Sequence, residues 1–284
     1  MKKVILFGAS GNLGREVATA LVNKGYDLTI VVRSEQKAKS LAHLTAKYMI
    51  ADVCKPHTLD NVCDHQDIVI SALGKSVSPT DRSKPGFIEV DLTGNLSILD
   101  QSIKSGVKQF IYFSAFHAER YLHLDYFRAH HEFSEQLKKS GINFIIIKPP
   151  AIFCAFKEIM EMAKKGRLIN IGSGDKKTNP IYEGDLAEIC LASIDETNVT
   201  IEAGGKTIYT RKQLNRIIQD HADKNKKIMT VPLALINFSL PLIKIFDKNM
   251  FDKLAFFTEV MKYDTIAPLV GDKTFEEYAN QNFN

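Results

Sequence analysis

Short apolar runs alternate along the first half of the chain with longer segments in which apolar residues recur every three to four positions. Uninterrupted apolar runs are typical of buried parallel strands. We expect strands at 4–7, 28–32, 47–50, 110–113 and 143–148. The range 67–74 predicts a further strand together with the loop that follows it. The segments between them predict amphipathic helices. Strands that alternate with helices predict an α/β fold with a doubly wound parallel sheet of the Rossmann type.

A glycine-rich turn follows the first strand, in the order Gly8-Ala9-Ser10-Gly11-Asn12-Leu13-Gly14. Strand, glycine turn and helix together are the context that dinucleotide binding requires. Gly8 permits the tight turn, Gly11 lets backbone amides approach a pyrophosphate, and Gly14 lets the helix pack closely on the strand. The helix N-terminus then faces the phosphates. The alternative is a glycine turn without a ligand. We predict cofactor binding by Gly8, Ser10, Gly11, Asn12, Leu13 and Gly14.

Arg33 predicts which dinucleotide binds. It ends the second strand, 19 residues after Gly14, where NAD-preferring proteins usually present an acid to the ribose 2′-hydroxyl. A guanidinium there would pair with a 2′-phosphate. The sequence therefore predicts NADP(H) in preference to NAD(H). The alternatives are a solvated surface arginine and a ribose contact from nearby Glu35.

Composition narrows the class of protein. The 284 residues are 45% hydrophobic and 25% charged, as in an ordinary globular protein. A net charge of +4 is too small to indicate a nucleic-acid partner. The cysteines, Cys54, Cys63, Cys154 and Cys190, lack metal-binding spacing and predict free thiols in a reducing cytoplasm. Because the N-terminal residues run straight into the first strand, we expect no signal peptide.

Three stretches resemble the extended and atypical short-chain dehydrogenase/reductases, in particular the NmrA-like NAD(P)H-binding family. They are the GxxGxxG spacing at 8–14, the stretch FIEVDLTGNLSILDQSIKSGVKQFIYFSAF at 87–116, and SGINFIIIKPPAIF at 140–153. The resemblance implies a Rossmann lobe over 1–150 and a smaller, mainly substrate-binding lobe over 151–284. Residues 179–194 would return to pack on the first lobe.

The resemblance also implies further cofactor contacts. Asp52 and Val53 would line the adenine pocket, although Asp52 could equally cap the helix that follows it. Small residues at Ser71, Ala72 and Gly74 would leave room for the cofactor to cross the strand ends. We expect Ala72, Leu73 and Gly74 to contact it. The segment that closes over the nicotinamide would contribute Lys148 and Pro149.

The catalytic motif departs from the pattern of the family. Short-chain dehydrogenase/reductases use Tyr-x-x-x-Lys on one helix face, where the lysine lowers the pKa of the tyrosine. Here Tyr126 is followed by His130, and an imidazole is only partly charged at neutral pH. Ser114, at the end of the fifth strand, is the candidate substrate-binding hydroxyl. In extended members the reacting hydroxyl can lie two residues further on, where this chain has Phe116. Tyr126 could also be a packed helix residue.

These features predict a cytoplasmic NADP(H)-dependent oxidoreductase that acts on a small carbonyl or quinone, with Tyr126, His130 and Ser114 as its catalytic residues. The alternatives are a sugar-nucleotide epimerase or dehydratase and a non-catalytic NAD(P)-binding sensor. The spacing of the histidines indicates no metal site. We expect a monomer or homodimer without a membrane span. The apolar stretch at 231–246 predicts a packed helix pair, with a membrane-surface segment or a substrate lid as alternatives.

Overall fold

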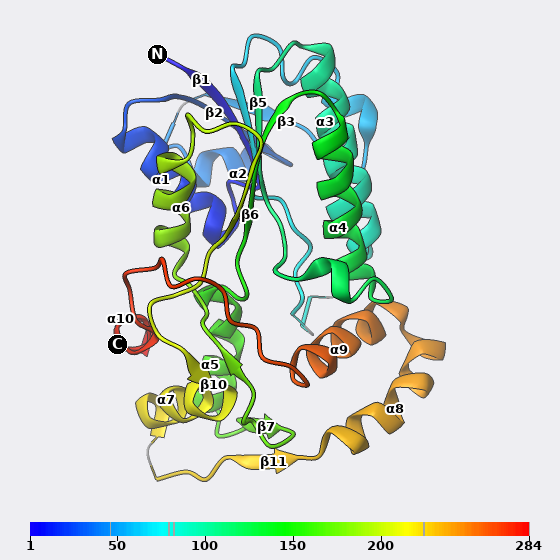
Figure 1. Ribbon diagram of the computed structural model, residues 1–284, viewed down its shortest axis with the longest axis vertical. Helices are drawn as coiled ribbons and strands as arrows, with labels where there is room; N and C mark the ends of the chain where they lie inside the picture. Colours follow the sequence, from blue (N-terminus) through cyan, green and yellow to red (C-terminus); the bar gives the residue numbers. More distant parts are fainter. Residues whose placement is uncertain (46, 79, 82, 224, 284) are drawn as a thin grey trace. The chain divides into compact units, whose positions relative to one another are not determined.

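The computed structural model describes residues 1–45, 47–78, 80–81, 83–223 and 225–283. In this part of the chain, seven strands form one sheet in the order β3-β2-β1-β4-β5-β6-β9 (Figure 1). They are β1 (Lys3–Phe7), β2 (Asp27–Val32), β3 (Tyr48–Ile50), β4 (Ile68–Ser71), β5 (Gln109–Phe113), β6 (Asn143–Lys148) and β9 (Val199–Glu202). The neighbouring strands from β3 to β6 all pair in parallel. The predicted Rossmann-type α/β fold is confirmed.

Helices cover both faces of this sheet, with α1 beside α6 on one face and α3 beside α4 on the other (Figure 1). The helical elements of this unit are α1 (Asn12–Asn23), α2 (Glu35–Ser40), η1 (Pro56–Leu59), η2 (Ile88–Gly94), α3 (Asn95–Lys104), η3 (Ala118–Arg120), α4 (Asp125–Lys139) and α6 (Glu183–Ala192). Both faces are covered, which is why the central strands are continuous apolar runs rather than alternating ones. All five residues of β5 are buried.

The chain divides into two compact units. The first comprises Met1–Lys75, Pro85–Lys148 and Glu183–Ile201, and it contains the sheet. The second comprises Ser76–Lys84, Pro149–Tyr182 and Glu202–Asn284. The roles expected for the two lobes, cofactor binding by 1–150 and substrate binding by 151–284, stay predictions.

The second unit is mainly helical, with two small sheets in its described residues. Its elements are η4 (Phe153–Phe156), α5 (Lys157–Lys164), β7 (Ile169–Ile171), β8 (Lys177–Thr178), β10 (Tyr209–Thr210), α7 (Arg211–Asp223), β11 (Met229–Val231), α8 (Leu233–Phe246), α9 (Lys248–Val260) and α10 (Phe275–Phe283). β10 pairs antiparallel with β8, and β11 pairs parallel with β7. Phe153, Met160, Leu214 and Phe275 are central members of its buried core.

Two segments differ from the sequence-based expectation. β9 was not expected from the sequence, because its residues do not form a continuous apolar run. They are half-buried or exposed, since β9 lies at the edge of the sheet. The stretch at 231–246 does form a helix that packs against a second one, α9, yet not one residue of α8 is buried.

Candidate functional site

The glycine turn joins β1 to α1 at the point where the strand order reverses, between β1 and β4. Ligands of open α/β sheets bind outside the carboxyl ends of the strands at such a point. Gly11 precedes the first residue of α1 and makes no side-chain cap, so the first amides of the helix have no side-chain acceptor there. The amides at a helix N-terminus and the helix dipole favour an anion at this end.

The three glycines of the turn have different surroundings. A Cβ on Gly8, whose φ is +85°, would lie 2.5 Å from the carbonyl oxygen of Ala72. On Gly14, a Cβ would lie 2.1 Å from the carbonyl oxygen of Gly8. On Gly11, however, a Cβ would meet only the Gly8 oxygen, at 3.3 Å, because Gly11 is exposed. Gly8 and Gly14 are thus required by the fold, whereas the space in front of Gly11 is open. Ser10 and Asn12 are exposed beside Gly11, and the binding of a pyrophosphate by these residues stays a prediction.

Arg33 lies exposed directly after β2. Among the described residues, the structure gives its guanidinium no ion-pair partner. The neighbouring acid, Glu35, accepts a hydrogen bond from the Tyr48 hydroxyl at 2.8 Å. Glu35 is therefore partly engaged within the protein, whereas the Arg33 cation remains available to an external anion.

The expected adenine contacts lie at the end of β3. Asp52 forms a local turn, because its carboxylate accepts the Cys54 N–H at 3.1 Å and its own N–H donates to the Thr58 hydroxyl. Asp52 thus caps a turn rather than a helix, since Lys55 stands at the N-cap of η1. Val53 is buried and packs against Gly94, where a Cβ would lie 3.0 Å from a Val53 methyl group.

The loop after β4 covers a buried carboxylate. Ala72 and Leu73 are partly exposed and Gly74 is exposed. Beneath them, Asp91 is fully buried in the π-helical segment η2, and its Oδ1 accepts the Lys75 N–H at 2.6 Å. Its Oδ2 is buried and has no hydrogen-bond partner within the described part of the chain. π-Helical segments are frequent at functional sites.

Burial raises the pKa of Asp91 well above its ordinary value, although the Lys75 N–H and charge act in the opposite direction. Asn95, the first residue of α3, links η2 to β4. Asn95 Oδ1 accepts from the Ser71 hydroxyl at 2.6 Å, and Asn95 Nδ2 donates to the Asp91 carbonyl at 2.9 Å. Asp91 was not expected from the sequence. The signal in the sequence was an acid that stands between two apolar residues, Val90 and Leu92.

Tyr126 and His130 lie together on α4, as their spacing predicts. Their ring centroids are 4.6 Å apart in an edge-to-face arrangement. His130 is buried, and its Nδ1 lies 2.6 Å from the hydroxyl of Tyr112 on β5. Burial also raises the pKa of Tyr112 well above its usual value. We therefore assign the phenol as donor and place the imidazole proton on Nε2.

His130 cannot replace the family lysine as a cation. Burial lowers its pKa from 6.5 to about 3, so the imidazole is neutral at physiological pH. The expectation of a partly charged imidazole is wrong, because it took no account of burial. Burial and the nearby Asp91 both raise the pKa of Tyr126.

Ser114 is engaged inside the protein. It follows β5 and is buried, and its Oγ lies 3.1 Å from the Oγ of Ser134 on α4. Ser134 in turn donates to the carbonyl oxygen of His130 at 2.7 Å. Ser114 therefore belongs to the buried polar layer between β5 and α4, where its hydroxyl has a hydrogen-bond partner in Ser134.

Lys148 ends β6, and Pro149 follows it as the first residue of a segment of the second unit. The Lys148 ammonium is 3.7 Å from a carboxylate oxygen of Glu119, and its side chain is mostly buried. Lys148 thus places a cation at the carboxyl end of a parallel strand, in the same unit as β1 and Gly8.

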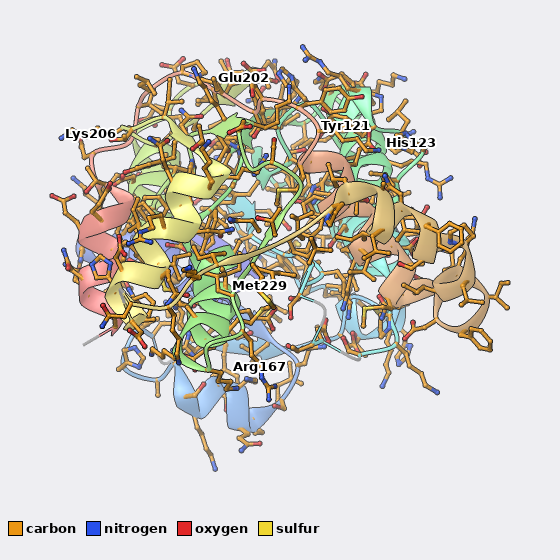
Figure 2. All side chains as sticks on the ribbon, turned by 90° about the horizontal axis from the view of Figure 1, so that it is seen from below. Tyr121, His123, Arg167, Glu202, Lys206 and Met229 are labelled. Atoms are coloured by element: carbon orange, nitrogen blue, oxygen red, sulfur yellow. The ribbon has the colours of Figure 1, made fainter. Side chains whose placement is uncertain are left out.

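The histidines are not gathered in one place. His123 is exposed in the turn before α4, beside Tyr121 (Figure 2), whereas His130 is buried. Within the described residues, no cluster of three or more His, Cys, Asp or Glu side chains has the arrangement of a metal site.

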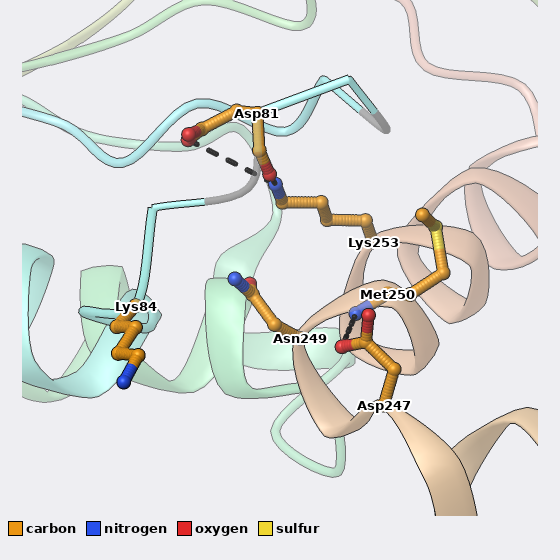
Figure 3. A pocket seen from close by; sticks show the side chains of 6 residues that line it. All are labelled: Asp81, Lys84, Asp247, Asn249, Met250 and Lys253. Carbon is orange, nitrogen blue, oxygen red and sulfur yellow. Dashed lines mark hydrogen bonds and ion pairs between the residues drawn. The ribbon is translucent and has the colours of Figure 1, made fainter.

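The second unit contains a hollow of about 200 Å³, lined by Asp81, Lys84, Asp247, Asn249, Met250 and Lys253 (Figure 3). Lys253 is buried there and donates to the Asp81 carbonyl, while the Asp247 carboxylate accepts the Met250 N–H. Asn249 donates to the Ser83 carbonyl at 2.9 Å. The bonds from Lys253 and Asn249 hold Asp81 and Ser83 to α9. None of the residues that line the hollow was predicted as a site residue.

Comparisons with known proteins identify the family and the fold of the chain. The model of the NAD(P)H-binding family matches residues 8–197. The photosystem II assembly factor Ycf39 of Cyanophora paradoxa is 25% identical over 268 residues, which cover 91% of this chain and 81% of that protein. No helix in the described residues is long and apolar enough to cross a membrane.

Two solved structures share the fold over nearly the whole chain. The Escherichia coli NADPH-dependent quinone oxidoreductase complexed with NADPH has a TM-score of 0.75 and 18% identity, covering 99% of this chain and 100% of that one. The Citrobacter triphenylmethane reductase complexed with NADP(H) has a TM-score of 0.77 and 16% identity, covering 99% of each. The chain belongs to the NAD(P)H-binding family, as its resemblance to NmrA-like proteins predicts.

Proposed function

We propose that this protein is an NADP(H)-dependent oxidoreductase that reduces a small carbonyl or quinone, and that quinones are its better substrates. The observation that carries the proposal is the neutral His130 beside Tyr126. In the usual tyrosine mechanism a neighbouring cation makes the phenol a stronger acid. Here burial and Asp91 raise the pKa of Tyr126 instead, so the phenol is a weak proton donor.

This weakness discriminates between hydride acceptors. Hydride transfer to a ketone or aldehyde leaves a strongly basic alkoxide, which needs a positioned acid in the transition state. Hydride transfer to a quinone leaves a hydroquinone anion whose charge is delocalised over the ring, so water can protonate it afterwards. A site that lacks a strong acid is therefore better suited to quinones.

The cofactor preference rests on Arg33. A guanidinium without a partner among the described residues, placed at the end of β2, is suited to the 2′-phosphate of NADP(H). The amides that follow Gly11 would hold the pyrophosphate. When bound, NADPH supplies the hydride, and the protein's part is to bind, orient and exclude water. The NADP(H) complexes of the two structures that share the fold support this preference.

A substrate panel tests the proposal. NADPH oxidation would be followed with benzoquinones and naphthoquinones, aldehydes, ketones and nucleotide sugars, each also with NADH. We expect turnover with quinones, weaker turnover with aldehydes, and none with nucleotide sugars. Tight NADPH binding without turnover on any compound would favour a sensor, and turnover of nucleotide sugars alone would favour an epimerase.

Tyr126→Phe tests the mechanism separately. Because the phenol is a weak acid, we expect quinone reduction to change by no more than about threefold, far below the 10²–10⁴-fold that general acid catalysis contributes. Tyr263→Phe, in the second unit, is the matched control. A loss of a hundredfold or more in Tyr126→Phe alone would establish the ordinary tyrosine mechanism instead.

A further inference from the structure

One face of α8 is both apolar and exposed. Leu235, Phe238, Leu242, Ile245 and Phe246 are between 61% and 86% exposed. At 3.6 residues per turn they fall within an arc of roughly 100°. We call these five residues the α8 outer face. The half-buried residues Ile236, Leu240 and Ile243 lie on the opposite side of the helix, and α8 packs against α9.

A helix that is apolar on nearly all sides is usually buried in a core or in lipid. α8 is neither buried nor long enough to span a bilayer, since 14 residues extend about 21 Å. Exposed, contiguous apolar surface of this kind marks an interaction site. The question is what covers it.

The dimensions of the outer face argue against a second copy of the chain. From Leu235 to Phe246 it extends about 17 Å, and it is no wider than a helix, about 10–12 Å. A stable protein interface needs about 800 Å² from each partner. No side chain of the face carries a hydrogen-bonding group, and a protein interface of ordinary composition has a polar rim. Insertion into a lipid hydrocarbon layer requires neither so large an area nor a polar rim.

The charge around the face identifies the kind of lipid. Residues 224–246 contain four lysines and no acidic residue. Lys226 and Lys227 are exposed ahead of β11, and Lys244 is exposed on the flank of α8, with its ammonium 5.1 Å from the Phe251 ring centroid. Asp223 offsets Lys226 in part, at 3.8 Å. Lysines beside an apolar helical face are typical of segments that lie on anionic membrane surfaces.

We propose that α8 binds an anionic membrane surface by inserting its outer face into the boundary between headgroups and acyl chains. The helix lies parallel to the membrane plane, Phe238 and Phe246 enter the acyl region, and the lysines contact lipid phosphates. The proposal concerns α8 alone and does not depend on the oxidoreductase activity proposed above.

Flotation with phosphatidylcholine vesicles, with and without phosphatidylglycerol, tests it. We expect the full-length protein to float with phosphatidylglycerol-containing vesicles, more weakly with phosphatidylcholine alone, and less as salt is raised. Replacing both Phe238 and Phe246 with serine should weaken binding by tenfold or more, because two large apolar side chains no longer enter lipid. Lys227→Glu together with Lys244→Glu should remove the preference for the anionic vesicles.

Leu269→Ser with Val270→Ser is the matched control, because both residues are exposed apolar positions of the same unit. This control should float like the wild type. All variants should retain the circular dichroism spectrum and the rate of NADPH oxidation with a water-soluble quinone. Absence of wild-type flotation, or flotation unchanged by the two serines, would overturn the proposal. A wild-type dimer that those serines convert to a monomer, without vesicle binding, would show that α8 binds a second copy instead.

Discussion

At the scale of single residues, different glycines of the turn are expected to serve the fold and ligand binding. A Cβ at Gly14 would collide with the Gly8 backbone, whereas one at Gly11 would project into open space. Backbone cannot move aside as a side chain can. A side chain added at Gly11 should therefore affect ligand binding, whereas one added at Gly14 should affect the stability of the fold.

Gly11→Val should abolish NADPH affinity and leave the fold intact, because the new side chain would occupy the space in front of the first α1 amides. Gly14→Ala should lower the free energy of unfolding by about 3 kcal/mol or more, as overpacking against backbone does. Calorimetric titration and urea unfolding measure the two effects. Wild-type affinity in a folded Gly11→Val protein would refute the assignment of the turn.

Arg33→Ala should weaken NADPH binding by about 1.5–3 kcal/mol, the usual contribution of a charged hydrogen bond, and leave NADH binding nearly unchanged. Arg216→Ala, an exposed arginine of α7, is the control and should change neither affinity. Fluorescence titration with both dinucleotides measures the difference. Equal affinity of the wild type for NADH and NADPH would contradict the predicted preference.

Residue identities that depend on backbone geometry were predictable, whereas charge states were not. The spacing of the glycines predicts a tight turn between a strand and a helix, and the structure has this turn between β1 and α1. The neutrality of His130 depends on burial by partners distant in sequence, Tyr112 among them. Asp91 is a similar case, because its environment is formed by the β4 loop and by α4 packing on η2.

At the scale of elements, α4 joins the sheet to a buried polar layer through His130 and Ser134. Strands with helices on both faces were predictable, because a parallel sheet leaves continuous apolar runs. β9 was not, since an edge strand with one exposed side carries a weak pattern. The exposure of α8 was also not predictable, because apolarity alone does not show what covers a helix.

The burial of His130 in α4 predicts a pH dependence of stability. Its folded pKa of about 3 lies below the unfolded value of 6.5, so between these values the unfolded state binds the extra proton. Stability conferred by the neutral imidazole is therefore present above pH 6.5 and is lost as the pH falls. Asp91, with its raised pKa, acts in the opposite direction on acidification.

A comparison with His130→Gln isolates the histidine, because Asp91 is common to both proteins. The stability advantage of the wild type over the variant should shrink by about 2 kcal/mol between pH 7.5 and pH 5. Urea unfolding at the two pH values measures it. An advantage that does not change with pH would mean that His130 is not buried in its neutral form.

At the scale of the whole molecule, the chain passes between the two units five times, after residues 75, 84, 148, 182 and 201. Neither unit is a continuous segment. β6 and β9 are neighbours in the sheet, but the chain forms part of the second unit, Pro149–Tyr182, between them. We therefore expect the two units to unfold together rather than as independent domains.

NADPH binding tests this cooperativity, because all the predicted contacts except Pro149 lie in the first unit. At a hundredfold excess over its dissociation constant, a ligand stabilises the folded state by about 2.7 kcal/mol. For a single cooperative unit of 284 residues the transition should move up by about 4–5 °C. Scanning calorimetry with and without NADPH measures it, with Gly11→Val as the control that should not respond. Two separate transitions, of which NADPH moves only one, would show that the units are thermodynamically independent despite the five passages of the chain between them.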